Sequence, residues 1–124
     1  MPGDILAVAV ELSHGATQAH WRSAISRAYY ANHHALKGWH SALPAAGSVG
    51  SATGSHEQLV AQLRNPDRQC SEVQKVTSGG FSMRLAGLLR QRVTADYILT
   101  GSTTQAEAET ACEVAPGILS QVAR

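Results

Sequence analysis

Residues 21–40 read WRSAISRAYYANHHALKGWH, and this stretch decides the fold class. Its apolar and small residues follow each other three or four positions apart, which is the spacing of one face of an α-helix. They are Trp21, Ala24 with its neighbour Ile25, Ala28, Ala31, Ala35 and Gly38, and Ala42 continues the row just past the stretch. The spacing predicts one long amphipathic helix over about 17–43. Pro44 cannot continue a helix, and the glycine- and serine-rich residues 44–55 predict a loop.

Three other segments show helical spacing with recognisable ends. The first covers about 4–14, with Asp4 as the expected N-cap and Gly15 as its stop. The second is SHEQLVAQLR at 55–64, where Ser55 and Gln58 have the spacing of a capping box. The third covers about 81–99, with apolar residues from Phe81 onward on one face. Residues 66–79 are polar and predict a loop, with at most one helical turn near 71–76.

A fifth helix is predicted after residue 103. Thr104 and Glu107 fit a capping box, and Pro116 is expected to kink or split the helix. At 124 residues the chain predicts a single domain, 1–124. It is 44% hydrophobic but only 5% aromatic, and strand-like runs of β-branched residues are missing. We expect an all-α, four- to five-helix up-and-down bundle with two long antiparallel central helices.

Charge and cysteine content restrict the classes of function. The formal net charge is +1, so any contact with RNA or nucleotide must be local rather than due to overall charge. Two cysteines without close spacing do not make a zinc framework. We expect no secretory leader, no membrane span and no cofactor, and therefore a soluble, cytoplasmic protein.

The histidines of the long helix do not have the spacing of metal ligands. His33 and His34 are adjacent and point about 100 degrees apart, whereas helical zinc ligands stand four apart. We therefore expect no metal site. A different group is spaced to share one face of this helix, namely Arg27, Tyr30 and His34. These three side chains could line a groove, or their polar tips could be satisfied within the bundle.

The fourth predicted helix carries LLRQRVTADY at 88–97. Arg92 and Asp96 are four apart, which is typical of an ordinary helical salt bridge. The alternative is an arginine cluster that binds phosphate, supplied by Arg84, Arg90 and Arg92.

Taken together, the segments resemble the HEPN superfamily of small helical domains. RSAISRAYYANHHALKG resembles its long second helix, SHEQLVAQL the short third helix, LAGLLRQRVTADY the helix that carries its polar motif, and AEAETACEVAPGIL its alanine-rich last helix. The likeness is to the branch with an Ala-Asp-Tyr signature. Many members are metal-independent RNases with an arginine, four to six residues, then a histidine, placed near a homodimer interface. Others pair with a nucleotidyltransferase as toxin and antitoxin, or bind nucleotides or RNA without cleavage.

The chain departs from the active pattern of that family. The resemblance places the motif arginine on Arg90, but six residues further on is Asp96 rather than histidine. Tyr97 follows Asp96 directly, whereas the toxin branch has its tyrosine two past the histidine. Cleavage of RNA without metal needs a base and an acid, and an exposed aspartate is a poor acid at pH 7. An imidazole from His34 or His56 would have to replace the missing group.

Three functions remain open from the sequence. The first is an RNA- or nucleotide-binding regulatory module, a homodimer in which Arg90, Arg92, Asp96 and Tyr97 face Arg27 and Tyr30. The second is a metal-independent endoribonuclease, either alone or as the toxin partner of a nucleotidyltransferase-type antitoxin, with candidate catalytic residues Arg90, Asp96 and His34. The third is a structural helical adaptor whose polar cluster is internal.

Overall fold

The computed structural model describes residues 2–97 and 103–123, and leaves out the side chains of residues 96, 97 and 115. This part of the chain forms five helices and no strand. They are α1 (Pro2–Ser13), α2 (Gln18–Ser41), α3 (Ser55–Arg64), α4 (Glu72–Tyr97) and α5 (Gln105–Val122).

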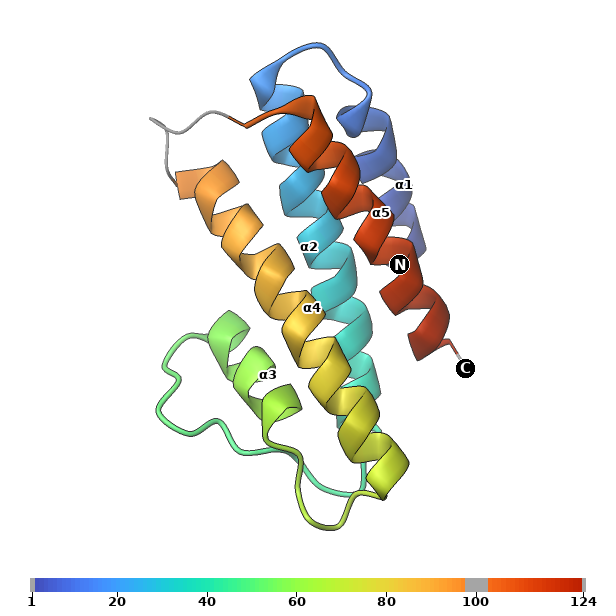
Figure 1. Ribbon diagram of the computed structural model, residues 1–124, viewed down its shortest axis with the longest axis vertical. Coiled ribbons are helices and arrows are strands. Elements are labelled where there is room, and N and C mark those ends of the chain that lie inside the picture. Colours follow the sequence, from blue (N-terminus) through green and yellow to red (C-terminus); the bar gives the residue numbers. More distant parts are fainter. Residues whose placement is uncertain (1, 98–102, 124) are drawn as a thin grey trace.

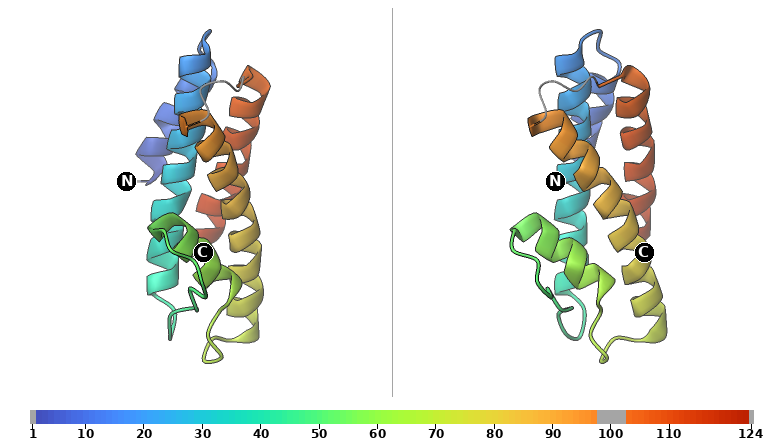
Figure 2. Two further views of the ribbon diagram at one scale, coloured as in Figure 1. Left: turned by 90° about the vertical axis from the view of Figure 1, so that its left-hand side faces the viewer. Right: turned by 60° about the vertical axis from the view of Figure 1, so that its left-hand side comes forward.

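Helices α1, α2, α4 and α5 run alternately up and down, and the short α3 lies in the connection between α2 and α4 (Figure 1). The two longest helices, α2 and α4, are antiparallel and pack against each other. α1 and α5 cover one end of α2, and α3 packs mainly against α4 at the other end (Figure 2). The all-α bundle with two long antiparallel central helices is therefore confirmed.

Helix α2 forms where its apolar spacing predicted it. The hydroxyl of Thr17 caps its N-terminus by accepting a hydrogen bond from the backbone N–H of His20. Its first half buries the predicted alanine stripe. In its last third the buried positions are Leu36 and His40, while Gly38 and the C-cap residue Ala42 are exposed. The predicted stripe is wrong there because it followed small residues rather than the face that the larger side chains bury.

One hydrophobic core runs along the length of α2. It includes the fully buried Tyr29 and Phe81, and Trp39 packs edge-on against Phe81 with ring centroids 5.0 Å apart. The alanines of α2 and α5 let the helices approach closely. The other main core residues are Ala24, Ile25, Ala28, Leu36, Leu63, Leu85, Ala108, Ala111 and Ile118.

Helix α4 begins at Glu72, so the predicted loop over 66–79 is wrong for most of its length. The hydroxyl of Ser71 accepts a hydrogen bond from the backbone N–H of Gln74, and the Gln74 side chain accepts one from the N–H of Ser71. This reciprocal pair starts the helix nine residues before Phe81, which was the expected start. Ser78 is fully buried and donates to the carbonyl oxygen of Leu63 at 2.6 Å, which fixes the added turns against α3.

The ends of the other helices differ in smaller ways from the prediction. Asp4 lies in the first turn of α1 rather than at its N-cap, because the helix begins at Pro2. The N-cap of α3 is Gly54, without a side-chain cap, and Gln58 donates instead to the carbonyl of Ala52, so the predicted Ser55 capping box is wrong.

Helix α5 has the predicted capping box between Thr104 and Glu107. It continues through Pro116 as one helix, so the expected split is absent from the described residues. A proline removes one backbone hydrogen-bond donor from a helix. Pro116 lies on the exposed side of α5. The stop predicted at Gly101 lies outside the described residues.

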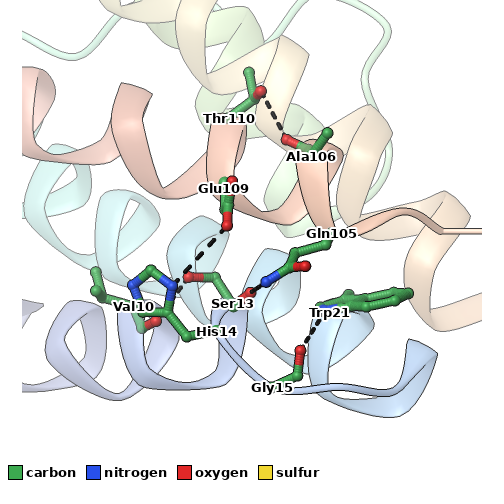
Figure 3. Close-up of polar contacts among 9 residues, drawn as sticks. All are labelled: Val10, Ser13, His14, Gly15, Trp21, Gln105, Ala106, Glu109 and Thr110. Carbon is green, nitrogen blue, oxygen red and sulfur yellow. Dashed lines mark hydrogen bonds and ion pairs between the residues drawn. The ribbon is translucent and has the colours of Figure 1, made fainter.

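The turn between α1 and α2 is tied to the first turn of α2, and the end of α1 is tied to the start of α5 (Figure 3). The indole N–H of Trp21 donates to the carbonyl of Gly15 at 2.8 Å. The Gln105 amide donates to the carbonyl of Ser13 at 3.3 Å. These bonds satisfy carbonyls near the end of α1 that have no partner within the helix.

No helix in the described part of the chain is long and apolar enough to cross a membrane.

Candidate functional site

Side chains from α2, α3 and α4 meet in one polar group beside the core. We call it the arginine–histidine cluster, and it consists of Tyr29, Tyr30, His33, His56 and Arg92. Tyr29, Tyr30 and His33 follow each other at helical spacing on α2, so they lie on neighbouring positions of one face. α3 contributes His56 from its first turn, and α4 contributes Arg92 from the last third of its length.

Arg92 is only 8% exposed. Its guanidinium lies over the rings of Tyr29 and Tyr30, with its central carbon 5.6 and 5.1 Å from the two ring centroids. It also donates a hydrogen bond of 2.8 Å to the hydroxyl of Tyr30. The aromatic faces and the hydroxyl replace part of the water that a buried guanidinium loses.

The histidines stand on the other side of Tyr29. The Tyr29 hydroxyl and Nδ1 of His56 share a hydrogen bond of 2.7 Å. The rings of His56 and His33 are 4.8 Å apart between centroids. The cluster therefore runs without a break from the buried Arg92 through the tyrosines to two imidazoles near the surface.

Burial and the nearby positive charges keep the histidines neutral. The pKa of His33 is lowered to about 4, and desolvation by burial is the largest cause. Electrostatic repulsion from His56, and then from His34, Lys37 and Arg92, adds to it. Desolvation first, and then the charge of Arg92, lowers the pKa of His56. Burial raises the pKa of the Tyr29 hydroxyl, although Arg92 opposes this effect. At pH 7 both imidazoles can accept a proton or a hydrogen bond.

The cluster opens into a cleft through His33. This cleft has a volume of about 520 Å³ and lies between α2, residues 42–54 and α3. It is lined by His33, Lys37, His40, Ser41, Leu43, Ala46, Ser55, Gln58, Leu59 and Gln62. Its size suits a small ligand or a nucleotide unit of a larger one.

A buried contact holds the loop wall of the cleft in place. His40 is 8% exposed, and its Nε2 accepts a hydrogen bond of 3.0 Å from the backbone N–H of Gly47. Gly47 packs so closely against the end of α3 that a Cβ atom there would overlap the carbonyl oxygen of Gln62. The 42–54 segment is therefore anchored at both α2 and α3.

Two features make the cleft attractive to anions. The Lys37 side chain is exposed and lines the cleft, and it stands four residues from His33 on the same face of α2. Ser55 and Gln58 line it from the first turn of α3, whose N-cap residue Gly54 provides no side-chain hydrogen bond. The uncapped N–H groups of that turn carry the positive end of the helix dipole.

The structure separates the residues that the sequence predicted to act together. Arg90 is exposed on the face of α4 opposite the core, whereas Arg92, two residues further on, is buried against α2. Of the expected group of Arg27, Tyr30 and His34, only Tyr30 belongs to the cluster. Arg27 and His34 are exposed and do not line this cleft. Of the two alternatives for these three side chains, Tyr30 shows the internal one, because its hydroxyl accepts a hydrogen bond from Arg92 inside the bundle. Arg84 bonds to Gln121 of α5, away from the site.

The side chains of Asp96 and Tyr97 lie outside the described residues, and their predicted roles stay predictions. Three residues of the site and cleft, His33, Tyr29 and Lys37, were not predicted from the sequence as site residues. His33 and Lys37 are four apart on the helix, and this spacing was a signal that could have identified them. His56 was considered only as a replacement imidazole, because nothing in its own segment showed that α3 would lie against Tyr29.

Within the described ranges, no group of three or more His, Cys, Asp and Glu side chains is placed to hold a metal ion. Comparison with protein-family models, with curated proteins and with solved structures finds no match to this chain.

Proposed function

We propose that this chain is an RNA- or nucleotide-binding module of the HEPN-like type, and that phosphate binds in the cleft between α2 and α3. The observation that carries the proposal is the convergence of three groups on this one cleft. They are the Lys37 ammonium, the neutral imidazole of His33 and the uncapped N-terminus of α3.

Each of these groups matches a part of a nucleotide. An ammonium and free backbone N–H groups at a helix N-terminus bind phosphate oxygens. The His33 ring offers a flat surface on which an unpaired base can stack, and its nitrogens can hydrogen-bond to base or ribose. The buried charge of Arg92 lies behind these groups and increases the positive potential that an anion meets there.

The proposal favours binding over strong catalysis. The family resemblance places Asp96 where active members have histidine, and it implies a homodimer with a degenerate active motif. Arg92 rather than Arg90 is the arginine that reaches the site, since Arg90 faces away from it.

Fluorescence anisotropy with a labelled single-stranded RNA tests this function. We expect wild-type protein to bind, with ATP as a competitor if single nucleotides suffice. Lys37→Gln should weaken binding several-fold and reduce the slope of log affinity against log salt by about 0.7, the value for one lost phosphate contact. The matched control is Arg64→Gln, which removes a charge from the exposed far end of α3. No RNA or nucleotide binding by the wild type, or equal binding by Lys37→Gln, would overturn the proposal.

A metal-independent RNase is the second candidate, and the histidine pair is the observation that favours it. His33 and His56 lie 4.8 Å apart between ring centroids and could divide the roles of base and acid. Because the pKa values of both are lowered, cleavage would be fastest below pH 6.5, where one imidazole becomes protonated while the other stays neutral.

Incubation of labelled RNA with purified protein in EDTA tests this second candidate. Cleavage that is lost in both His33→Gln and His56→Gln, but kept in His34→Gln, would establish the RNase. His34 is the matched control because it is exposed and adjacent to His33. RNA that stays intact between pH 5 and 8 would leave binding without cleavage.

A further inference from the structure

The loop wall of the cleft depends on a hydrogen bond that only a neutral histidine can make. His40 lines the cleft from the last turn of α2, and Leu43 and Ala46 line it from the loop. The Nε2 atom of His40 accepts a hydrogen bond from the backbone N–H of Gly47. A backbone N–H can only donate, so Nε2 must be unprotonated for this bond to exist. We call this pair the His40–Gly47 latch.

The packing around Gly47 makes the latch sensitive to a single proton. Gly47 is buried and is pressed against the carbonyl oxygen of Gln62, and the N–H of Ser48 donates to the carbonyl of Asn65 at 3.0 Å. Protonation of His40 would place two N–H donors face to face in this tight contact. The buried N–H of Gly47 would then have lost its acceptor, which is costly away from water. The wall must move for that N–H to reach water.

We infer that the His40–Gly47 latch regulates the cleft by pH, holding its loop wall in place at neutral pH and releasing the wall in acid. This inference rests on the proposed function, because it describes the regulation of that same binding site. The effect of the latch is opposite to that of charge alone. Histidines that gain protons would strengthen the binding of an anion, whereas release of the wall weakens it.

Few charged groups lie around His40 in the described structure. On its own helix, Lys37 and His33 line the same cleft one and two turns earlier. Residues 42–54 of the loop contain no titratable side chain, and the residues of α3 that line the cleft are uncharged. No acidic side chain therefore lines the cleft to stabilise a protonated His40.

The start of α4 also lies beside this end of α2 (Figure 1). Its charged residues Glu72 and Lys75 are paired with each other at 3.2 Å. Burial lowers the pKa of His40 from its ordinary value of 6.5. The latch should therefore be closed at pH 7 and open at a pH below 6.5.

The amide of Gly47 reports the latch in the protein without RNA. In NMR spectra recorded from pH 7 to pH 4.5, its proton should shift and exchange faster with water as the bond is lost. His40→Gln offers Gly47 a side-chain oxygen that does not titrate, so the same amide should hold its position over this range. His34→Gln is the matched control, because it removes an exposed histidine of the same helix, and it should behave as wild type. A wild-type Gly47 amide that does not change, or one that changes equally in His40→Gln, would overturn the latch.

Fluorescence anisotropy with the labelled single-stranded RNA tests the regulation itself. Wild type and His34→Gln should bind several-fold more weakly at pH 5 than at pH 7, whereas the ratio of the two affinities should be near one or reversed for His40→Gln. Equal or stronger binding by the wild type at pH 5 would overturn regulation by the latch. A wild type that binds no RNA at either pH would overturn the proposed function and with it the regulation of binding, while the Gly47 amide still decides whether the latch exists.

Discussion

Burial is the largest cause of the shifted pKa values of Tyr29, His33 and His56, and the guanidinium of Arg92 adds a smaller effect at short range. Its charge is buried, so it is screened by water much less than a surface charge would be. It therefore disfavours protonation of the imidazoles beside it. Their neutral state follows from their place in the bundle, because an exposed histidine titrates near its ordinary pKa of 6.5.

The first residue-scale prediction concerns stability at acidic pH. The folded chain holds the pKa of His33 at about 4, below the ordinary value of 6.5. Between these values the unfolded chain binds more protons, so stability is lost as pH falls from 6.5 toward 4. For this partly exposed ring, His33 should account for about 1–2 kcal/mol of that loss after solvent screening. Urea unfolding at pH 7 and at pH 4.5 should show a smaller loss for His33→Gln than for wild type. An identical loss in both proteins would contradict the shift.

The second prediction concerns Asn32, which is fully buried in α2. Its amide N–H donates to the carbonyl of Ala28, but its Oδ1 atom has no hydrogen-bond partner in the described structure. A buried polar atom without a partner costs about 1–3 kcal/mol. Asn32→Leu has the same branched shape and should raise the free energy of unfolding by about 1 kcal/mol. Asn32→Ala, which leaves a cavity, should not. Lower stability of the leucine variant would show that Oδ1 is satisfied.

At the scale of elements, the position of the helices follows from sequence more reliably than their ends do. The pattern S-x-x-Q occurs at both 55–58 and 71–74. Only the second occurrence caps a helix, because Ser71 directly precedes α4 whereas α3 already has Gly54 at its N-cap. A loop was predicted over 66–79, but the helix begins at Glu72 and continues through Gly79 and Gly80, with Ser78 anchored to α3. That tertiary contact outweighs the low helix propensity of glycine, and it is not visible in local sequence.

The connection between α2 and α3 gives a prediction at this scale. Gly47→Ala would place a Cβ atom against the carbonyl oxygen of Gln62, and it would displace the hydrogen bond to His40. We expect a loss of about 1–3 kcal/mol of stability, as in other overpacked sites. Gly54→Ala is the matched control, since a Cβ atom there meets nothing within 4 Å. Thermal unfolding of the two variants checks this. Equal midpoints would show that the loop wall of the cleft is not anchored at Gly47.

At the scale of the whole molecule, the sequence predicted the bundle but only part of the site. The apolar spacing of α2 and of the second half of α4 was enough for the fold class. The site depends on how α2, α3 and α4 are rotated about their axes. That rotation turned Arg92 inward and Arg90 outward, although both lie in the segment that was expected to bind phosphate. It also brought His56 to Tyr29 across 27 residues of chain, which no local spacing could indicate.

The same rotation places the polar and the exposed apolar side chains on different faces. The cleft between α2 and α3 holds the groups suited to phosphate, whereas Val73, Val76 and Met83 are exposed on the outer face of α4. A homodimer would carry two independent clefts, because the lining of each cleft comes from a single chain. We therefore expect one RNA or nucleotide site per chain. Isothermal titration calorimetry checks this, and one site per two chains would contradict it.

The most direct test of the central claim is an NMR titration of the isotope-labelled protein with a short single-stranded RNA. The account predicts that the largest amide shifts occur at Ser55, His56 and Glu57 in the first turn of α3 and at His33 and Lys37 on α2. These shifts should shrink as salt is raised, because phosphate contacts release counterions. Shifts centred instead on Arg84 and Arg90 on the outer face of α4, or no shifts at all, would contradict a phosphate-binding cleft between α2 and α3.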